Sequence, residues 1–330
     1  MKIEELSNYV CINPFEYVQV FQKGLEGCCW DWAKVRVNNP NIEEAWKELK
    51  WYREGALLSP LKTCTLSCPF LKKLKETGDL QTMFVAKKDA MDKYGVVDPK
   101  GPKRIRITCD DSCNLYCKSC RNHVEVTDYE LVKSRILDIE DSWGQNLEEI
   151  QVLGSGDPLF SKPIREFLVN FNSEKFPNLK NIYLHTNGQL LTEKLWKQMK
   201  SVPYIHTLEI SIDASSKETY EKIRRGGRWE TLLKNIDFIS KQPSISYMCV
   251  SFVVQRDNYH EIVDFFNLFS PFLSREGRSW EVGYNQVMHW SKLSDEDFEK
   301  INIFNDSQAV LDIKNQLRSL DRNYVRTNII

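Results

Sequence analysis

The stretch Arg104-Ile-Arg-Ile-Thr-Cys-Asp-Asp-Ser-Cys113-Asn-Leu-Tyr-Cys117-Lys-Ser-Cys120 joins an alternating apolar segment to three closely spaced cysteines. Residues 104–108 have the period-two pattern of a strand, and the cysteines follow as a C-x3-C-x2-C loop. A 4Fe–4S cluster ligated entirely by protein takes four cysteines. Three thiolates on one loop match three irons of such a cluster and leave the fourth iron open to a small molecule. The spacing by itself predicts a metal site.

Beyond this loop, short apolar runs alternate with amphipathic stretches as far as about residue 290. Alternation of strands and helices with crossovers of this length predicts βα units and a parallel sheet. Six such units form an open, partial (β/α)6 barrel, whose functional face lies at the carboxyl ends of its strands. The predicted strands are 104–108, 149–153, 181–185, 207–212, 246–254 and 280–287, and the predicted helices are 129–141, 162–170, 193–200, 229–240 and 259–268.

The first hundred residues follow a different pattern, rich in cysteine and poor in apolar runs. Small modules of this composition usually need a metal for stability. Asn39-Pro-Asn41 predicts the start of a helix over residues 42–54. We therefore expect a cysteine-bearing module over 1–86, a linker over 87–102, the α/β barrel over 103–290 and a C-terminal extension over 291–330.

The composition excludes several functional classes. The 330 residues include 45 basic and 46 acidic side chains, a formal net charge of −1 that argues against a general nucleic-acid or membrane-surface binder. No run approaches the roughly 18 apolar residues that a membrane-spanning helix needs. The first ten residues, MKIEELSNYV, lack the layout of a secretion signal. A cytoplasmic protein is expected.

Ten cysteines in a cytoplasmic chain indicate metal binding or catalysis, because disulfides are disfavoured in a reducing compartment. Four of them lie between Cys109 and Cys120. A structural zinc site with Cys109 as the fourth ligand is one interpretation of this group, because tetrahedral zinc favours cysteines at short spacings. An iron–sulfur cluster is the other, and the segments that follow later strands favour it.

The cysteine loop resembles the signature of the radical S-adenosylmethionine (SAM) superfamily, C-x3-C-x-Φ-C, at the same position after the first strand. The resemblance implies that the open iron binds the amino and carboxylate groups of SAM. An electron from the cluster then cleaves SAM to methionine and a 5′-deoxyadenosyl radical. The residue before the third cysteine is usually aromatic in that family and is Ser119 here. Adenine packing must therefore come from elsewhere in the chain.

Further segments carry the same resemblance, which covers about residues 103–290. Gly154-Ser-Gly-Asp-Pro158 resembles the family's Gly-Gly-Glu-Pro turn, in which glycines allow close backbone approach to a ligand. Arg224-Arg-Gly-Gly227 is interpreted as a helix end with a carboxylate contact. The implied SAM-binding residues are Gly154, Ser155, Gly156, Asp157, Pro158, His185, Asn187, Ser211, Asp213, Gln255 and Asn285, with Asn258 a weaker candidate.

The N-terminal cysteines resemble a SPASM or twitch module, which carries an auxiliary iron–sulfur cluster in many radical SAM enzymes. Such modules usually follow the barrel, whereas this one precedes it. The resemblance implies Cys11, Cys28, Cys64 and Cys68 as the four ligands, with Cys29 the alternative to Cys28. The expected cofactors are thus two 4Fe–4S clusters and SAM. A zinc ribbon-like module is the alternative for this region.

One face of the predicted fifth strand is wholly apolar, and the other carries Tyr247, Cys249, Ser251 and Val253. The apolar face should pack on helices, which turns Cys249 toward the barrel interior. We expect the Cys249 thiol to give a hydrogen atom to a substrate radical, although a small buried hydrophobe is the simpler interpretation. The same parity places Glu209, Ser211 and Asp213 inside, joined by His185, Glu281 and Asn285.

A polar interior of this kind predicts a hydrophilic substrate. We expect hydrogen abstraction from a C–H bond of a sugar or small metabolite, with a ribosomally made peptide as the alternative substrate. The outcome is an epimerisation, an oxidation or a rearrangement. A flavodoxin- or ferredoxin-type electron donor is the expected partner. A zinc-stabilised interaction module without catalysis is the further alternative.

Overall fold

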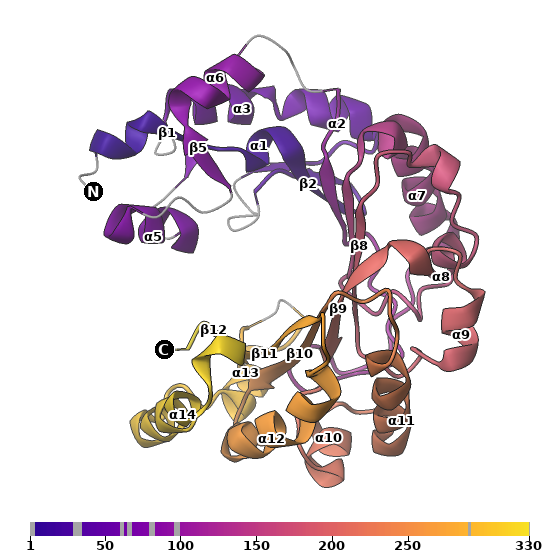
Figure 1. The fold of residues 1–330 in the computed structure, drawn as a ribbon, viewed down its shortest axis with the longest axis vertical. Coiled ribbons are helices and arrows are strands. Elements are labelled where there is room, and N and C mark those ends of the chain that lie inside the picture. The colour runs from indigo at the N-terminus through magenta and orange to yellow at the C-terminus, as the bar shows by residue number, and fades with distance from the viewer. Residues whose placement is uncertain are drawn as a thin grey trace. The chain divides into compact units, whose positions relative to one another are not determined.

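The computed structural model describes residues 4–28, 35–59, 63–64, 68–78, 83–95, 100–289 and 292–329 (Figure 1). The chain divides into two compact units, each assembled from several segments. The first unit comprises Met1–Asp110, Asp128–Gly154 and Asn172–Lys180. The second comprises Asp111–Thr127, Ser155–Phe171 and Asn181–Ile330.

The first unit contains two sheets. Strands β1 (Tyr9–Cys11) and β5 (Phe84–Ala86) form an antiparallel pair. In the other sheet β2 pairs parallel with β6, β6 pairs parallel with β7, and β3 and β4 extend the edge beyond β2 in antiparallel fashion. The strands of this sheet are β2 (Tyr17–Phe21), β3 (Gly24–Glu26), β4 (Arg36–Val37), β6 (Arg104–Ile107) and β7 (Glu149–Val152).

Helix α2 (Ile42–Glu48) begins at a capping residue that the sequence supplies. Asn41 accepts hydrogen bonds from the amides of Glu43 and Glu44 at 3.0 Å, an N-cap that contributes about 1 kcal/mol. The helix predicted over 42–54 is divided at Leu49 into two. The helices are α1 (Asn13–Glu16), α2 (Ile42–Glu48), α3 (Lys50–Leu58), α5 (Pro69–Thr77), α6 (Lys87–Tyr94) and α7 (Tyr129–Trp143).

The predicted domain boundaries stay a prediction, and two observations bear on them. Strand β2, from the expected N-terminal module, is hydrogen-bonded to β6, the first strand of the βα series, with Val18 opposite Ile105. Helix α6 occupies part of the interval expected as a linker. The N-terminal residues therefore supply strands to the same sheet as the barrel segment.

The second unit contains a parallel sheet in which each strand pairs with the next in the order β8-β9-β10-β11-β12. Four of these strands match predicted ones, so the mixed α/β class with a parallel sheet is confirmed. The fifth lies in the C-terminal extension and was missed, because three residues are too short for a periodicity argument. The strands are β8 (Asn181–Thr186), β9 (Ile205–Ser211), β10 (Tyr247–Val254), β11 (Ser279–Gln286) and β12 (Val325–Thr327).

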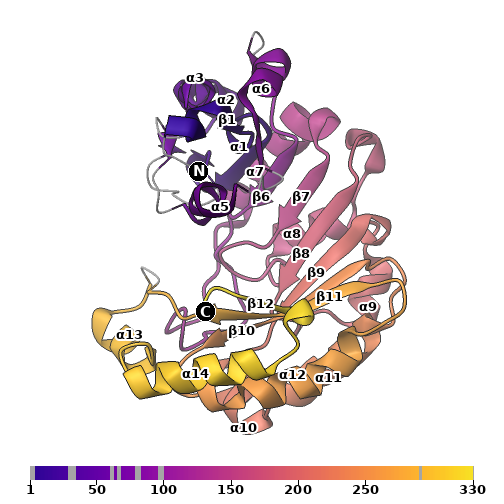
Figure 2. The same ribbon diagram turned by 60° about the vertical axis from the view of Figure 1, so that its left-hand side comes forward.

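One face of this sheet packs against helices, as the wholly apolar side of β10 predicts. Phe252 of β10 contacts Phe265 of α12, with ring centroids 4.8 Å apart. In Figure 2, α11, α12 and α14 run along this side of β10 and β11. The helices are α8 (Lys162–Val169), α9 (Glu193–Gln198), α10 (Lys217–Ile223), α11 (Trp229–Ser240), α12 (Ile262–Leu273), α13 (Asp295–Ile301) and α14 (Ser307–Ser319).

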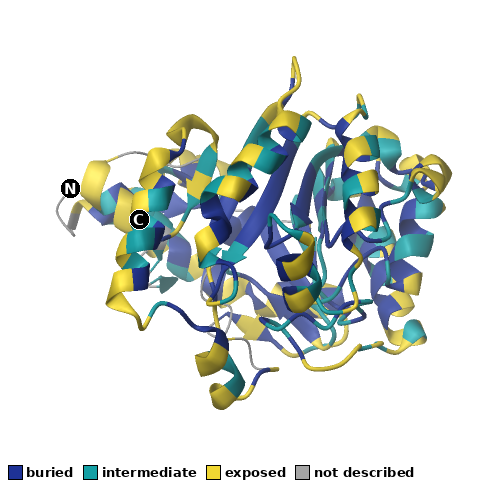
Figure 3. Cartoon of the chain, turned by 90° about the horizontal axis from the view of Figure 1, so that it is seen from below, coloured by how far each residue is buried: buried dark blue, intermediate teal, exposed yellow. Residues whose placement is uncertain are grey.

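Burial follows this layering, with the strands buried and the outward sides of the helices exposed (Figure 3). Met248, Val250 and Val254 of β10 have no exposed surface. Short 3₁₀ helices join several elements. They are Glu4–Asn8, Gly144–Asn146, Ser173–Lys175, Val202–Tyr204, Tyr259–Glu261 and Arg322–Tyr324.

Candidate iron–sulfur and SAM site

The loop that carries Cys113, Cys117 and Cys120 belongs to the second unit and is fixed by backbone hydrogen bonds. The Cys113 amide donates to the Glu125 carbonyl at 3.0 Å. The Tyr116 amide donates at 3.0 Å to the carbonyl of Arg225, which follows α10, and the Lys118 amide donates at 2.9 Å to that of Ile223, the last residue of α10. The loop is thus held along its length, which orders the three thiols in advance of any ligand.

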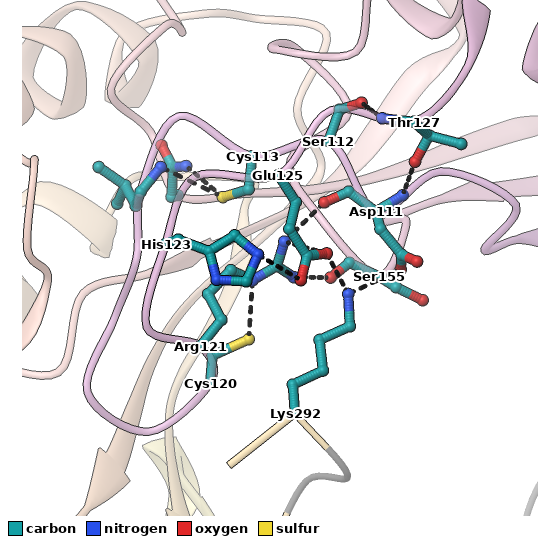
Figure 4. A network of polar contacts seen from close by, with 12 residues as sticks. Asp111, Ser112, Cys113, Cys120, Arg121, His123, Glu125, Thr127, Ser155 and Lys292 are labelled. Atoms are coloured by element: carbon teal, nitrogen blue, oxygen red, sulfur yellow. Dashed lines mark hydrogen bonds and ion pairs between the residues drawn. The ribbon is translucent and has the colours of Figure 1, made fainter.

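Each sulfur of the loop lies beside a nitrogen donor from another side chain. The Asn187 amide approaches Cys113 Sγ at 3.9 Å, and Asn187 follows strand β8. Arg224, at the end of α10, places Nη1 3.7 Å from Cys117 Sγ. Arg121 places Nε 3.4 Å from Cys120 Sγ (Figure 4). Donors of this kind stabilise a thiolate, which is the form that ligates iron.

The thiols themselves are poorly solvated. Burial is the main cause that raises the pKa of Cys113 to about 12, and burial likewise raises the pKa of Cys117. Buried thiolates are unfavourable without compensating positive charge, which the irons of a cluster supply. Among the described residues no three Cys, His, Asp or Glu side chains are close enough together to hold a metal ion. Three cysteines with donors behind them fit a cluster, in which each thiolate binds a different iron.

The glycine turn is fastened directly to the cysteine loop. The Asp157 amide donates to the Ser112 carbonyl at 2.8 Å, and Arg121 Nη2 donates to the Ser155 carbonyl at 2.5 Å. A Cβ at Gly156 would lie 2.1 Å from the Ser112 oxygen, so only glycine permits this approach. Ser155 to Pro158 therefore lie against the cysteine loop, while Gly154 belongs to the first unit.

The Asp157 carboxylate is buried and already hydrogen-bonded. It accepts hydrogen bonds from the Thr186 hydroxyl and the backbone N–H of Asn187, both at 2.7 Å, and from the backbone N–H groups of Leu159 and Phe160. These contacts tie the glycine turn to the end of β8. The Asp157 side chain therefore has a structural role. The backbone of the turn is the part that stays available for the predicted SAM contact.

Polar side chains at the strand ends form a hydrogen-bonded row. His185 Nε2 lies 2.7 Å from Ser211 Oγ, and Ser211 Oγ lies 3.2 Å from Ser251 Oγ. Burial, as the largest cause, lowers the pKa of His185, which keeps the ring neutral. The row thus presents neutral donors and acceptors, suited to the hydroxyl groups of a ribose.

Asp213 and Gln255 lie at the carboxyl ends of β9 and β10 and differ in their contacts. Asp213 is buried with a left-handed φ of 68°, and its carboxylate pairs with Arg224 Nη2 at 2.8 Å and accepts from the Val253 amide at 2.8 Å. Neither amide atom of the fully buried Gln255 has a hydrogen-bond partner in the described part of the chain. An unsatisfied buried amide is costly unless a ligand completes it, so Gln255 fits a cofactor-binding role.

Asn258 and Asn285 complete the predicted set. Asn258 donates to the carbonyls of Asp213 and Val253 at 2.8 and 2.9 Å, so its side chain holds the strand ends in place. Asn285 of β11 lies opposite Val253 in register and is half-buried.

The polar face of the sheet carries a second group, aligned by strand register. Glu209, Cys249 and Glu281 stand side by side on β9, β10 and β11. Arg326 of β12 lies across them, with Nη2 3.0 Å from Glu209 and 3.6 Å from Cys249 Sγ, and Nε 3.1 Å from Glu281. Gly283 makes room for this crossing, because a Cβ there would lie 3.1 Å from Arg326 Nη2.

Sequence reasoning missed Arg326 and Arg121. Arg326 comes close to Cys249 only because β12 joins the sheet edge, and no motif marks it. Arg121 could have been noticed because it directly follows the third cysteine. The sequence does not show, however, in which direction its side chain points. Arg224, expected as a carboxylate contact, pairs with the carboxylate of Asp213.

In the first unit, four cysteines from three segments of the chain lie near one another. Cys11 ends β1, Cys28 follows β3, and Cys68 precedes α5. Cys11 is buried in one apolar cluster with Cys64 and Cys68 beside it. Burial is the largest cause that raises the Cys11 pKa, followed by the nearby Cys64 and, more weakly, Cys28 and Cys68. Cys29 lies outside the described residues, and Cys109 is buried in this unit.

The match to known proteins agrees with this site. Residues 109–269 match the family described as the radical SAM superfamily. The matched residues include the loop of Cys113, Cys117 and Cys120. The chain carries a radical SAM domain, for which the family implies a 4Fe–4S cluster and SAM.

Several curated relatives are similar over part of their length. The GTP 3′,8-cyclase of Petrotoga mobilis is 26% identical over 54% of this chain and 54% of its own length. The molybdenum cofactor biosynthesis protein 1 of Drosophila melanogaster is 29% identical over 49% of this chain and 28% of its own. The probable GTP 3′,8-cyclase of Methanocaldococcus jannaschii is 27% identical over 52% and 55%. This chain spans about half the length of the cyclases it matches.

Solved structures give weaker similarity. One described as native anSMEcpe with bound AdoMet has a TM-score of 0.44 at 16% identity, covering 68% of this chain and 64% of that one. One of TYW1 with a lysine-pyruvate adduct has a TM-score of 0.43 at 17% identity, covering 76% and 82%. The SPASM- or twitch-like assignment of residues 1–86 stays a prediction. No helix among the described residues is long and apolar enough to cross a membrane.

Proposed function

We propose that this chain is a radical SAM enzyme that reductively cleaves SAM and abstracts hydrogen from a C–H bond of a polar substrate. The observation that carries the proposal is the loop of Cys113, Cys117 and Cys120, in which each sulfur lies beside a nitrogen donor. The loop lies within a radical SAM domain. A flavodoxin- or ferredoxin-type protein is the proposed electron source.

A 4Fe–4S cluster held by Cys113, Cys117 and Cys120 would supply the electron for reductive cleavage of SAM. The chain's own residues bind and orient. The backbone of Ser155 to Pro158 meets the amino-acid part of SAM, and His185 with Ser211 holds the ribose hydroxyls through neutral hydrogen bonds. The buried side-chain amide of Gln255 forms its missing hydrogen bonds with the cofactor. Arg224 and Asp213 compensate each other's charge without water.

The polar face beside the site supports a substrate rich in hydroxyl or amino groups. Glu209, Glu281 and Arg326 together carry two negative charges and one positive, and both carboxylates contact the guanidinium. Burial opposes ionisation of Glu209, but the charge of Arg326 and hydrogen bonds from Tyr183 and Arg326 counteract burial and lower the pKa of Glu209. Such a surface favours a sugar or amino sugar. A peptide segment is the alternative substrate.

Cys249 is the proposed donor of a hydrogen atom to the substrate radical. Burial raises the pKa of Cys249, so the sulfur keeps its hydrogen at neutral pH. Transfer breaks the S–H bond and forms a C–H bond, leaving a sulfur radical. One electron from the flavodoxin- or ferredoxin-type donor and one proton restore the thiol. Net inversion at carbon, an epimerisation, is the outcome this donor supports.

A Cys249→Ala chain should form 5′-deoxyadenosine at the wild-type rate while losing the epimerised product. Cys249→Ser is the matched control for packing, because its hydroxyl is a poor hydrogen-atom donor and should behave like alanine. Deuterium from heavy water should enter the wild-type product. Normal product from either variant would remove Cys249 from the mechanism.

A GTP 3′,8-cyclase-like reaction is the second candidate, favoured by the names of the similar proteins. It is tested by incubating the reduced protein with SAM and GTP and searching for a cyclised nucleotide by mass spectrometry. The pairing of Arg326 with two carboxylates argues for a less anionic substrate than a triphosphate.

The first experiment is anaerobic reconstitution. The protein should be brown, bind about eight irons as two 4Fe–4S clusters and release 5′-deoxyadenosine when dithionite is added with SAM. A colourless protein that binds zinc and not SAM would instead support the interaction-module interpretation.

A further inference from the structure

Two arginines approach the sulfurs of the three-cysteine loop, and the mechanism above assigns them no effect on the cluster. Arg121 is 2% exposed and directs Nε at Cys120 Sγ. The side chain of Arg224 is 11% exposed and directs Nη1 at Cys117 Sγ. Cys113 has a neutral amide, that of Asn187, in the equivalent place. Fixed positive charge is thus placed against two of the three sulfurs.

Both guanidinium groups are locked in position by other contacts. Arg121 donates through Nη1 to the Asp111 carbonyl at 2.6 Å and through Nη2 to the Ser155 carbonyl at 2.5 Å (Figure 4). Arg224 is held by the buried carboxylate of Asp213 at 2.8 Å. A buried arginine with this many contacts cannot turn away to solvent, so its charge acts on the site permanently.

The two arginines differ in how their charge is balanced. Asp213, paired with Arg224, is fully buried. Glu125, 3.3 Å from Arg121 Nη1, is half-buried and also pairs with Lys292 and, at 3.8 Å, with His123. Lys292 also reaches Asp111 at 3.4 Å. Because Glu125 is shared between Arg121 and Lys292, it neutralises Arg121 only in part.

We propose, building on the proposed function, that Arg121 and Arg224 are positioning residues that raise the reduction potential of the cluster on Cys113, Cys117 and Cys120. The reduced cluster carries one more negative charge than the oxidised one, so a nearby fixed cation stabilises it preferentially. Hydrogen bonds to ligand sulfurs act in the same direction. The consequence is a cluster that a physiological electron donor can reduce.

The test is a redox titration of the reconstituted full chain, following the EPR signal that changes when SAM is added. Arg121→Gln and Arg224→Gln should each move the midpoint to more negative potential. At a fixed potential below the wild-type midpoint the ratio of reduced to oxidised cluster should fall about tenfold, which is about 59 mV for one electron. Arg121→Lys keeps the charge and should recover part of this shift.

Arg225→Gln is the matched control. Arg225 holds the same loop through the carbonyls of Tyr116 and Arg121, at 2.8 and 3.0 Å, and its ring contact is with Tyr116. Its loss disturbs the loop without removing a donor to sulfur. Midpoints of the Arg121 and Arg224 variants that equal the wild-type value, or that Arg225→Gln reproduces, would overturn the proposal.

If Arg121→Gln fails to hold a cluster, the proposal can be tested with a variant that should shift the midpoint potential in the opposite direction. Glu125→Gln leaves Arg121 in place and removes its counter-charge, so the midpoint should move to more positive potential. An unchanged or more negative midpoint would contradict the proposal. Failure of the wild-type chain itself to take up a SAM-responsive cluster would refute the proposed function instead, and the two failures are therefore distinguishable.

Discussion

The two cysteine groups of this molecule are built in opposite ways. Cys113, Cys117 and Cys120 lie within eight consecutive residues, and backbone hydrogen bonds to Glu125 and to the C-terminal end of α10 order their loop. The N-terminal group draws its cysteines from three segments, with Cys11 in one, Cys28 in another and Cys64 and Cys68 close together in the third. A local loop can be recognised from its spacing, whereas a group assembled from distant segments depends on the fold around it.

Their surroundings also differ. The cysteines of the loop lie beside two arginines and an amide, close to polar strand ends. Cys11, Cys64 and Cys68 of the N-terminal group pack in an apolar cluster with Leu6, Leu71, Leu74 and Phe84. Cationic donors suit a centre that accepts and gives electrons beside a charged cofactor. An apolar pocket suits a fully ligated centre that stabilises its module or relays electrons.

The largest expected effect comes from breaking the loop itself. Cys117→Ala should lower 5′-deoxyadenosine formation by more than about 100-fold, because loss of a ligand is more damaging than loss of an outer-shell partner. Cys64→Ala, in the other group, should retain substantial SAM cleavage. Liquid chromatography of dithionite-reduced reactions measures both. Equal loss in the two variants would mean that the groups do not have separate roles.

Iron content gives the second comparison. Cys11→Ala with Cys64→Ala should lower bound iron from about eight to about four per chain, with the SAM-responsive EPR signal retained. Because a metal centre contributes folding free energy to a small module, this double variant should also lose thermal stability. Unchanged iron would show that the N-terminal cysteines hold no cluster.

A substitution in the glycine turn tests whether the turn must pack closely against the cysteine loop. Gly156→Ala should destabilise the fold by about 2–3 kcal/mol, because its Cβ would overlap the Ser112 carbonyl, 2.1 Å away. SAM binding, measured by calorimetry on the reconstituted protein, should weaken as the turn moves. Ser155→Ala is the control, since it preserves the backbone and the carbonyl that Arg121 uses. Matching behaviour of the two variants would argue against a close-packing role for the turn.

The smallest effect is expected at the surface of the first unit. Hydrogen bonds from Lys180 and Lys103 lower the pKa of Glu148 to about 2. A carboxylate whose pKa is lowered by folding stabilises the folded protein fully at a pH above its ordinary pKa of about 4.5. This contribution is lost as the pH falls toward 2. Wild type should therefore melt slightly above Glu148→Gln at pH 7, with a gap that narrows below about pH 4.5. A gap independent of pH would exclude the ionised pair as its cause.

Much of the fold and part of the site could be predicted from local pattern. Alternation of apolar residues located β8 to β11 and the main helices, because period and length distinguish strand from helix. The same parity on β10 placed Phe252 against α12 and Cys249 on the polar face beside Glu209. Strand β12 and the division of the helix at Leu49 escaped, since both depend on packing rather than on periodicity.

The sequence by itself determined the three-cysteine loop, its position after a strand and the polar ends of the strands that follow. Those features are local, and the spacing of residues carries them. Only the tertiary structure decided which side chains surround the sulfurs: Arg121 turned onto Cys120, Arg224 brought from α10 to Cys117, and Arg326 laid across Gly283 toward Cys249. These contacts join residues up to 107 positions apart, and chain topology and close packing, rather than any local preference, bring them together.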